Sequence, residues 1–273
     1  SHVGGPSDSE EFFFSKVGLL DGTAELRGSI PFNRFYGTFL KVLRPNMLKE
    51  VDGKTYFSAS DRLIQFAASG LAGVWAEENT REAIYDALKR KETFATSGPR
   101  MKVRFFAGYD LENSKLDDLS LIQDAYRSSI PMGGTLNISA NKNPTFLVWA
   151  IADPVGAPLQ RTQIIKGWLE DGEHKEKVFD IACSDGLSVD PETYRCPDNN
   201  AWVDLSNCSI SADSGAREMK VFWQDPEFIK NQGAFYYSRV LENPVCRWST
   251  WDSVRNGQKP RSDIPATIQE RVW

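Results

Sequence analysis

Apolar and polar positions between residues 70 and 100 predict a strand, a helix and a second strand, in that order. Residues 71–76 form a short apolar run, which is typical of a strand buried on both faces. Apolar side chains then recur at helical spacing over residues 83–88, and residues 93–96 are again strand-like before a Ser-Gly-Pro break. A strand, a crossover helix and a second strand form a βαβ unit, so we expect a parallel sheet or barrel here.

The expected turn between the first strand and the helix carries Glu77, Glu78 and Asn79. Asn79 stands three residues before Glu82, which is the spacing of a capping box. Parallel folds keep their sites at the carboxyl ends of strands, where a carboxylate can act as a general base or bind a metal. We therefore name Glu77 and Glu78 as candidate catalytic residues. The alternative is that both carboxylates only favour the positive start of the helix.

Four further residues are candidate substrate contacts on the same rim, namely Trp75, Asn79, Arg81 and Arg100. The indole of Trp75 would form part of a pocket wall. The guanidinium of Arg100 could hold a phosphate, sulfate or carboxylate through two parallel hydrogen bonds. A surface ion pair is the simpler explanation of Arg100.

Aromatic and aliphatic residues between positions 32 and 40 follow helical spacing, and residues 60–68 also predict a helix. After residue 100 the pattern changes to short apolar runs separated by turns. Apolar and polar residues alternate over 101–106, and candidate strands cover residues 135–140, 145–152, 162–168, 175–182, 201–205, 217–223 and 234–241. Asp171-Gly172, between two of these runs, is a hairpin signal. We therefore expect an α/β domain over residues 1–99 and an all-β domain, an antiparallel β-sandwich, over residues 100–273.

Composition narrows the possible partners. The 273 residues are 41% apolar and 25% charged, which is ordinary for a globular protein. The formal net charge is −5, and Lys and Arg do not cluster. Nucleic-acid binding depends on neutralising phosphates, so we expect no nucleic-acid partner. We also expect no membrane span, because no apolar run is long enough to cross a bilayer.

Four cysteines, Cys183, Cys196, Cys208 and Cys246, all lie in the expected β domain. An even number is compatible with two disulfides and with a periplasmic or secreted location. Three pairings are possible and the sequence does not choose among them. Cys183 with Cys196 would close a short loop, and Cys208 with Cys246 would tie two strands together. Free buried thiols are an alternative, whereas zinc is disfavoured because no C-x-x-C pair exists and His174 is the only histidine nearby.

Segments spread over nearly the whole chain resemble one large bacterial family. They are FFFSKVGLLDG at 12–22, GVWAEENTREAIYDALKRKETFATSGPR at 73–100, PTFLVWAIADPVGA at 144–157, QIIKGW at 163–168, KVFDIACSDG at 177–186, AFYYSRVLENPVCRWSTWD at 234–252 and PATIQERVW at 265–273. The family is catalogued as a domain of unknown function, and its members resemble metal hydrolases of the PHP type (polymerase and histidinol phosphatase), which are related to amidohydrolase barrels. This resemblance implies that residues 1–99 are the carboxyl-terminal remnant of a PHP-like barrel, followed by the β-sandwich.

The resemblance also singles out His2, which occupies the histidine of the family's Asp-x-His metal motif. A neutral imidazole is a good ligand for zinc, manganese or iron. The aspartate of this motif would stand just before Ser1, and a His-x-His pair is expected on an earlier strand. We therefore expect the chain to be the carboxyl-terminal part of a longer protein, with the missing barrel portion as its partner. The isolated chain should bind little metal and be inactive.

In functional terms, the resemblance implies that the longer parent is a metal-dependent hydrolase. It would act on a phosphoester or another ester-type bond, with zinc, manganese or iron activating water. The substrate would be a small molecule or another ester. The alternative is that the β-sandwich is a binding or structural module without catalysis. The sequence contains no G-x-S-x-G, Walker loop or G-x-G-x-x-G, which argues against serine-hydrolase, P-loop and dinucleotide chemistry.

Overall fold

The computed structural model describes residues 24–25, 27–43, 45–57, 70–111, 115–139 and 142–273. The chain divides into two units whose segments interleave along the sequence. Unit 1 contains residues 1–70, 201–212 and 244–270, and unit 2 contains residues 71–200, 213–243 and 271–273. The expected domain boundary at residue 100 stays a prediction.

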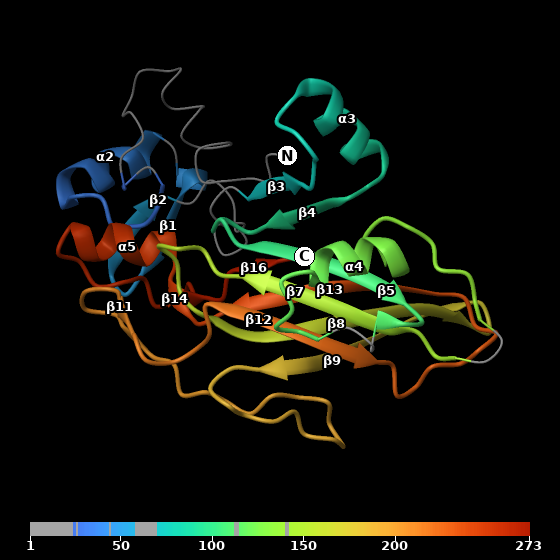
Figure 1. Cartoon of the computed structure of the whole chain (residues 1–273). Helices are drawn as coiled ribbons and strands as arrows, with labels where there is room; N and C mark the ends of the chain where they lie inside the picture. Colours follow the sequence, from blue (N-terminus) through green and yellow to red (C-terminus); the bar gives the residue numbers. More distant parts are fainter. Residues whose placement is uncertain (1–23, 26, 44, 58–69, 112–114, 140–141) are drawn as a thin grey trace. The chain divides into compact units, whose positions relative to one another are not determined.

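Unit 2 is built on two β-sheets (Figure 1). The larger sheet has the order β3 (Leu71–Val74), β4 (Thr93–Thr96), β16 (Arg271–Val272), β13 (Ala234–Glu242), β8 (Leu159–Glu170) and β9 (Glu173–Cys183). The smaller sheet has the order β12 (Glu218–Gln224), β7 (Thr145–Ile151), β5 (Lys102–Gly108) and β6 (Ile130–Pro131). Every strand pair in the described part of these sheets is antiparallel.

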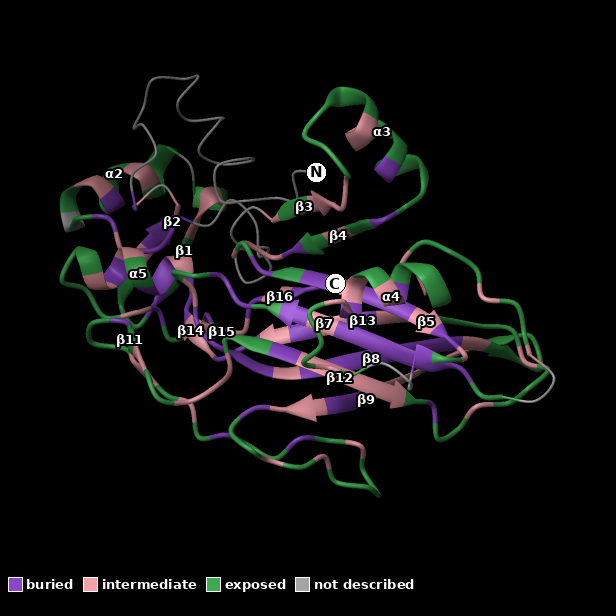
Figure 2. Ribbon diagram, in the orientation of Figure 1, coloured by how far each residue is buried: buried purple, intermediate pink, exposed green. Residues whose placement is uncertain are grey.

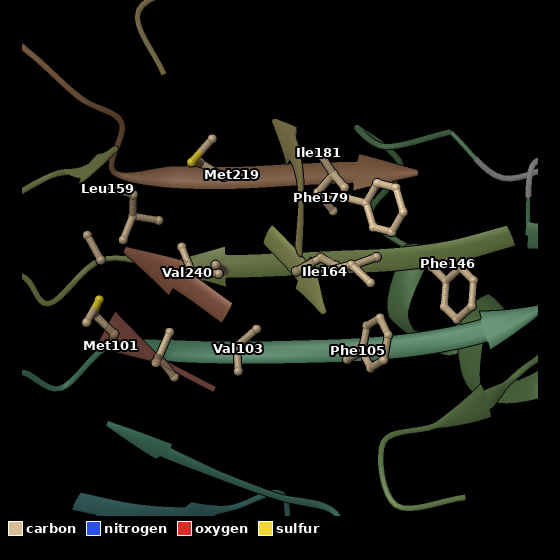
Figure 3. Packing of buried hydrophobic residues seen from close by; sticks show 14 residues of the cluster. Met101, Val103, Phe105, Phe146, Leu159, Ile164, Phe179, Ile181, Met219 and Val240 are labelled. Atoms are coloured by element: carbon tan, nitrogen blue, oxygen red, sulfur yellow. The ribbon is translucent and has the colours of Figure 1, made fainter. Parts of the chain in front are cut away.

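The two sheets share one apolar core, in which side chains of both sheets meet (Figure 3). Val148 of the smaller sheet and Ile164, Phe179 and Val240 of the larger sheet are each 0% exposed. Long buried stretches run along β7 and β8 (Figure 2). Burying one such side chain contributes about 1.5–3 kcal/mol, so this interface is a main source of stability in unit 2. The expectation of a β-rich, sandwich-like part is confirmed.

Helix α4 (Leu121–Ser128) covers the other face of the smaller sheet. Leu121 and Ala125 of the helix join a second buried cluster with Phe106 of β5 and Leu147 of β7. Successive strand residues point to opposite faces, so Phe105 enters the inter-sheet core while Phe106 faces the helix. The apolar run around residue 147 is continuous because both of its faces are covered.

The hairpin predicted at Asp171-Gly172 is confirmed. Strands β8 and β9 pair from Glu170 opposite Glu173, which leaves these two residues as the turn. Their φ angles are +52° and +81°, the left-handed conformation that a tight two-residue hairpin requires. The strand predicted over residues 135–140 is wrong, because residues 135–139 form no strand.

The predicted parallel βαβ unit over residues 71–96 is also wrong. Helix α3 (Arg81–Lys89) does lie between β3 and β4, but the two strands pair antiparallel, with Val74 opposite Thr93. The helix is therefore inserted into the connection of a hairpin and is not a crossover. The described residues show no remnant of a parallel barrel.

The start of helix α3 also differs from the expectation. Thr80 is the N-cap, and its side chain accepts a hydrogen bond from the backbone N–H of Ala83 at 3.3 Å. The helix therefore begins one residue later than a cap at Asn79 would place it. Both residues have a side-chain oxygen suited to capping, so the local sequence did not separate them.

Unit 1 contains short elements. They are α2 (Arg34–Leu43), the 3₁₀ turn η2 (Pro45–Met47), β1 (Leu48–Val51), β2 (Lys54–Phe57), β10 (Val203–Asp204), β11 (Ser209–Ile210), β14 (Val245–Cys246), α5 (Trp248–Arg255) and β15 (Thr267–Ile268). Phe32 and Phe57 are buried in a small cluster beside α2. The helical spacing at residues 32–40 is thus confirmed as α2, whereas the helix predicted over residues 60–68 lies outside the described residues. No helix within the described ranges is both long and apolar enough to span a bilayer.

All four cysteines form disulfides. Cys183 at the end of β9 is bonded to Cys196 in unit 2, with 5.6 Å between their Cα atoms. Cys208 is bonded to Cys246 in unit 1, with a Cα–Cα distance of 5.7 Å. Of the three possible pairings, this one confines each bond to a single unit.

Candidate functional site

Unit 2 contains a cavity of about 580 Å³ beside β13. Residues 234–238 of β13 line one side, and residues 130–136 line another. Thr93 of β4, Phe146 of β7 and Trp273 also line the cavity. The volume falls within the range of about 300–1,000 Å³ that is usual for ligand pockets. This cavity is the main candidate site in the described part of the chain.

Aromatic rings dominate the lining of this cavity. The ring of Phe146 lies 4.6 Å from that of Tyr236 and 5.7 Å from that of Phe105, centroid to centroid. Phe235 and Tyr237, on the other face of β13, stack with a centroid distance of 6.3 Å. Such rings offer a large apolar surface with little side-chain entropy to lose. The site is therefore suited to an occupant with apolar groups.

A buried ion pair holds Tyr236 in place. The hydroxyl of Tyr236 donates to Asp225 Oδ2 at 2.7 Å, and Lys166 Nζ donates to the same oxygen at 2.6 Å. The side chains of Lys166 and Asp225 are 3% and 0% exposed. Burial, together with the hydrogen bond to this carboxylate, raises the pKa of Tyr236. The tyrosine thus stays protonated and acts as a fixed wall and not as a base.

Gly133, in the segment 130–136 that lines the cavity, packs closely against the backbone just before β4. Its φ angle is +84°, and a Cβ atom there would lie 2.5 Å from the carbonyl oxygen of Lys91. Only glycine allows this conformation at such a close approach. Lys91 is the single charged residue among the described lining residues. The cavity consequently offers one cation at its margin and an otherwise uncharged surface.

Trp75 lies in a packed cluster at the side of β5. Its indole N–H donates to the carbonyl of Val103 at 2.8 Å, and its ring lies 5.5 Å from that of Phe94. The guanidinium carbon of Arg104 stands 3.6 Å from the centroid of the indole ring. These contacts occupy both the polar edge and one face of the indole. They give Trp75 a structural role, and its assignment as a substrate contact stays a prediction.

The same region contains Glu92, which the sequence analysis did not single out. Glu92 is 4% exposed and accepts hydrogen bonds from Tyr126 and from Arg90. The hydroxyl of Tyr126 accepts from Arg104 at 2.8 Å. Partial burial and the bond to Glu92 raise the pKa of Tyr126. Glu92 follows Lys-Arg-Lys in the sequence, a charge run that normally indicates a solvated surface.

The remaining rim candidates are exposed. Glu77, Glu78, Asn79 and Arg81 are all exposed around the start of α3. No hydrogen bond or ion pair joins these four side chains to one another within the described part of the chain. Their proposed roles stay predictions.

Arg100 makes its best-defined contact through its backbone. Its N–H donates to Asp153 Oδ2 at 2.6 Å, while its side chain is exposed. Partial burial raises the pKa of Asp153, but N–H donors from Arg100, Val155 and Gly156 outweigh it and hold that pKa below its ordinary value. Arg100 thus helps to fix the turn after β7. Its role in binding an anion stays a prediction.

The chain matches a protein family over residues 1–273, and this family is described as "Protein of unknown function (DUF3604)". The chain belongs to the DUF3604 family. Membership of a family of unknown function, expected from the sequence, is thereby confirmed. The further likeness to PHP-type hydrolases stays a proposal. Neither the curated proteins nor the solved structures gave a match to this DUF3604 chain.

The described residues of the DUF3604 chain do not fit a divalent metal. They contain no group of three or more His, Cys, Asp or Glu side chains placed to hold an ion. The cysteines are bonded to one another, and His174 is exposed on β9 opposite Leu169. His2, the predicted ligand, lies outside the described residues. We therefore derive no chemical step through a metal from this part of the chain.

Proposed function

We propose that unit 2 of this DUF3604 chain is a recognition module that binds a ligand in its cavity, and that the chain belongs to a longer metal-dependent hydrolase. The cavity of about 580 Å³ carries the first half of this proposal. Its aromatic wall at Phe146 and Tyr236 is held by the buried Lys166–Asp225 pair, so the site exists before a ligand arrives. A preformed wall lowers the ordering cost of binding.

The hydrolase half of the proposal rests on the resemblance of the sequence to PHP-type enzymes. The substrate would be a phosphoester or another ester of a small molecule, and zinc, manganese or iron would supply an activated water. His2 and the barrel portion outside this chain would hold the metal. Glu77 or Glu78 would act as general base from the exposed turn before α3.

A second candidate is a binding or structural module without catalysis. The observation that favours it is the absence of a metal-ligand cluster from the described residues, together with the exposure of Glu77 and Glu78. A carboxylate used as a general base at neutral pH usually needs burial or a charged neighbour to raise its pKa.

Hydrolysis is tested on the longer protein with a panel of phosphate and carboxylate esters, with and without added manganese or zinc. Under the hydrolase proposal, Glu77→Gln or Glu78→Gln lowers kcat by at least about 100-fold, the usual contribution of a general base. The matched control is Glu176→Gln, an exposed carboxylate on β9 that should leave kcat unchanged. No hydrolysis of any ester, with or without metal, favours the second candidate. Equal kcat values in all three variants would exclude Glu77 and Glu78 as the general base, and rates that do not depend on added metal would exclude the metal-dependent mechanism.

Binding is tested on the isolated chain by screening uncharged and aromatic compounds with NMR. Ala107→Phe places a ring into the cavity lining and should abolish binding. Ala72→Phe, on the exposed face of β3, is the control and should bind normally. Equal binding by both variants would place the ligand outside this cavity and end the proposal for unit 2.

The two disulfides bear on location. Disulfides form and persist in oxidising compartments, so we propose that the protein is periplasmic or secreted.

A further inference from the structure

The outer face of the larger sheet in unit 2 carries a polar row across β13, β8 and β9, which lie side by side (Figure 1). Gln163 of β8 lies opposite Arg239 of β13 and opposite Asp180 of β9. Ile164 and Val240 point into the inter-sheet core, and successive strand residues point to opposite faces. Gln163, Arg239 and Asp180 therefore share the face that lies away from this core.

Asp180 is a buried carboxylate at the centre of this face, with a side chain that is 0% exposed. Its Oδ1 accepts hydrogen bonds from Gln163 Nε2 at 2.6 Å and from Arg195 Nη1 at 3.4 Å. Its Oδ2 accepts from Arg161 Nη1 at 3.3 Å and from the backbone N–H of Cys196 at 2.7 Å. Two guanidinium groups thus converge on one buried negative charge, which such a charge requires.

Arg239 joins this cluster without a carboxylate of its own. Its Nε donates to Gln163 Oε1 at 2.6 Å, while the amide nitrogen of Gln163 donates to Asp180. Among the described residues, no carboxylate lies within ion-pair distance of Arg239 and no acceptor contacts its two terminal nitrogens. One carboxamide therefore links Arg239 to the groups around Asp180 and leaves its planar fork of N–H donors open.

The cluster is positively charged in a chain of the opposite sign. Arg161, Arg195 and Arg239 carry three positive charges, and Asp180 is the one carboxylate of the described residues that pairs with any of them. The cluster therefore has a net charge of +2, whereas the chain has −5. The side chains of Arg161 and Arg195 are 21% and 50% exposed. Like charges repel more strongly when they are partly removed from water, so a bound anion would stabilise this arrangement.

Arg195 is held in place although it lies outside the strands. Cys196, the next residue, forms a disulfide with Cys183 at the end of β9. The backbone N–H of Asp180 donates to the carbonyl of Tyr194 at 2.9 Å, and the N–H of Cys196 returns a hydrogen bond to the Asp180 side chain. The backbone of Arg195 therefore needs little ordering when a ligand binds.

We propose that Arg195 and Arg239 bind a doubly charged oxyanion, a phosphate or sulfate group, on this outer face of unit 2. A guanidinium presents parallel N–H donors that bind two oxygens of such a group at once. A phosphate ester carries a charge of about −1.5 to −2 at neutral pH, which balances the cluster. Arg161 and Gln163 position the two binding arginines through Asp180. None of these side chains belongs to the described lining of the cavity, so the site is independent of ligand binding there and of hydrolysis.

The probe is inorganic phosphate, added to the isolated chain at about pH 7.5 with the ionic strength kept constant by sodium chloride. The Nε–H signals of the arginine side chains are followed by NMR. Those of Arg195 and Arg239 should shift until they saturate, whereas that of Arg127, which is 75% exposed and paired with Asp124, should not shift. Sulfate should act as phosphate does. Acetate, with one negative charge, should bind at least about tenfold more weakly.

Phenyl phosphate distinguishes the two sources of the group. A Kd equal to or lower than that of inorganic phosphate assigns the group to an organic ligand, and a higher Kd assigns it to the free ion. Either result supports the site.

Two variants test the assigned residues. Arg239→Gln removes the open guanidinium, and the Kd for phosphate should rise at least about tenfold, as expected for the loss of charge-assisted hydrogen bonds. Arg195→Gln, at the more exposed position, should have the same effect and provides the test if Arg239→Gln does not fold. Arg127→Gln changes the net charge equally and is the matched control; its Kd should stay within about twofold of the unmodified chain. Circular dichroism and the thermal midpoint show which variants are folded.

Four results would overturn the proposal. They are the absence of saturable shifts at Arg195 and Arg239, the same shifts with sodium chloride alone, acetate binding as tightly as phosphate, and equal Kd values for the folded variants and Arg127→Gln. Each of these results concerns the outer face alone and leaves the proposal for the cavity unchanged.

Discussion

Replacing Asp263 by asparagine tests the electrostatics of unit 1. The carboxylate of Asp263 accepts two hydrogen bonds from Arg261, each 2.9 Å long, and lies 3.0 Å from Lys49 Nζ. The side chain of Arg261 is 2% exposed, donates to the carbonyl of Gly28 at 2.9 Å and lies over the ring of Tyr56. Asp263→Asn keeps the shape of the side chain but removes the charge that compensates this buried guanidinium.

The size of the effect follows from the pKa of Asp263. The hydrogen bonds from Arg261, and then that from Lys49, lower it from 3.8 to about 2. This lowering, at about 1.36 kcal/mol per pKa unit, corresponds to about 2 kcal/mol. Because the pKa is lowered in the folded state, this stabilisation is present above pH 4 and is lost as the pH falls toward 2. Asp263→Asn should therefore lower the free energy of unfolding by about 2 kcal/mol at pH 7 and by much less near pH 2.

The assay is urea unfolding with the disulfides intact, followed by tryptophan fluorescence at pH 7, 5, 3.5 and 2.5. Asp52→Asn, in the exposed turn between β1 and β2, is the control and should change stability by less than about 0.5 kcal/mol. A loss below about 0.5 kcal/mol for Asp263→Asn at pH 7 would refute the reasoning, as would an equal loss at pH 7 and pH 2.5.

Three further predictions concern unit 2. Gly172→Ala, at φ +81°, should lower the free energy of unfolding by about 1 kcal/mol in urea, and an unchanged value would contradict the strained-turn argument. Replacing Cys183 and Cys196 together by serine removes a disulfide that spans 13 positions and should lower the free energy of unfolding by about 3 kcal/mol in the same urea titration. Non-reducing peptide mapping that pairs either cysteine with another partner would contradict this prediction. Since the pKa of Tyr236 is raised in the folded state, the unfolded chain ionises this group first, and the free energy of unfolding should fall as the pH rises above 10. Tyr236→Phe should lose less stability than the unmodified chain between pH 9 and 11. An equal loss would contradict the raised pKa of Tyr236.

The β-rich part of the fold could be predicted because its signals are local. Asp171-Gly172 specifies a two-residue turn, and that turn sets the register of β8 and β9 from Glu170 opposite Glu173 onward. The apolar run of residues 145–152 indicated a strand, and the structure shows that the inter-sheet core covers one of its faces and α4 the other. Each of these features depends on residues that are close in the sequence, where backbone preferences act directly.

The candidate site could be predicted only in part. The rim residues were chosen because a parallel arrangement would have gathered them at the carboxyl ends of strands. That premise is wrong, since β3 and β4 are antiparallel. Glu92 was missed because its hydrogen-bond partner Tyr126 lies 34 positions away in the sequence. A single sequence contains no signal for such a contact.

The sequence by itself indicated the long strands β7, β8, β9, β12 and β13, the turn at Asp171-Gly172 and helix α3, because hydrophobic periodicity and turn residues act over a few positions. Only the tertiary structure decided the direction in which β4 pairs, since residues 93–96 would show the same pattern in either orientation. It also decided the cavity, whose lining residues come from distant parts of the chain, among them positions 91–93, 105–109, 130–138, 144–146, 228–238 and 273. The physical reason is that periodicity specifies which face of an element is buried but not which element covers it. That choice depends on packing and hydrogen bonding across the whole unit.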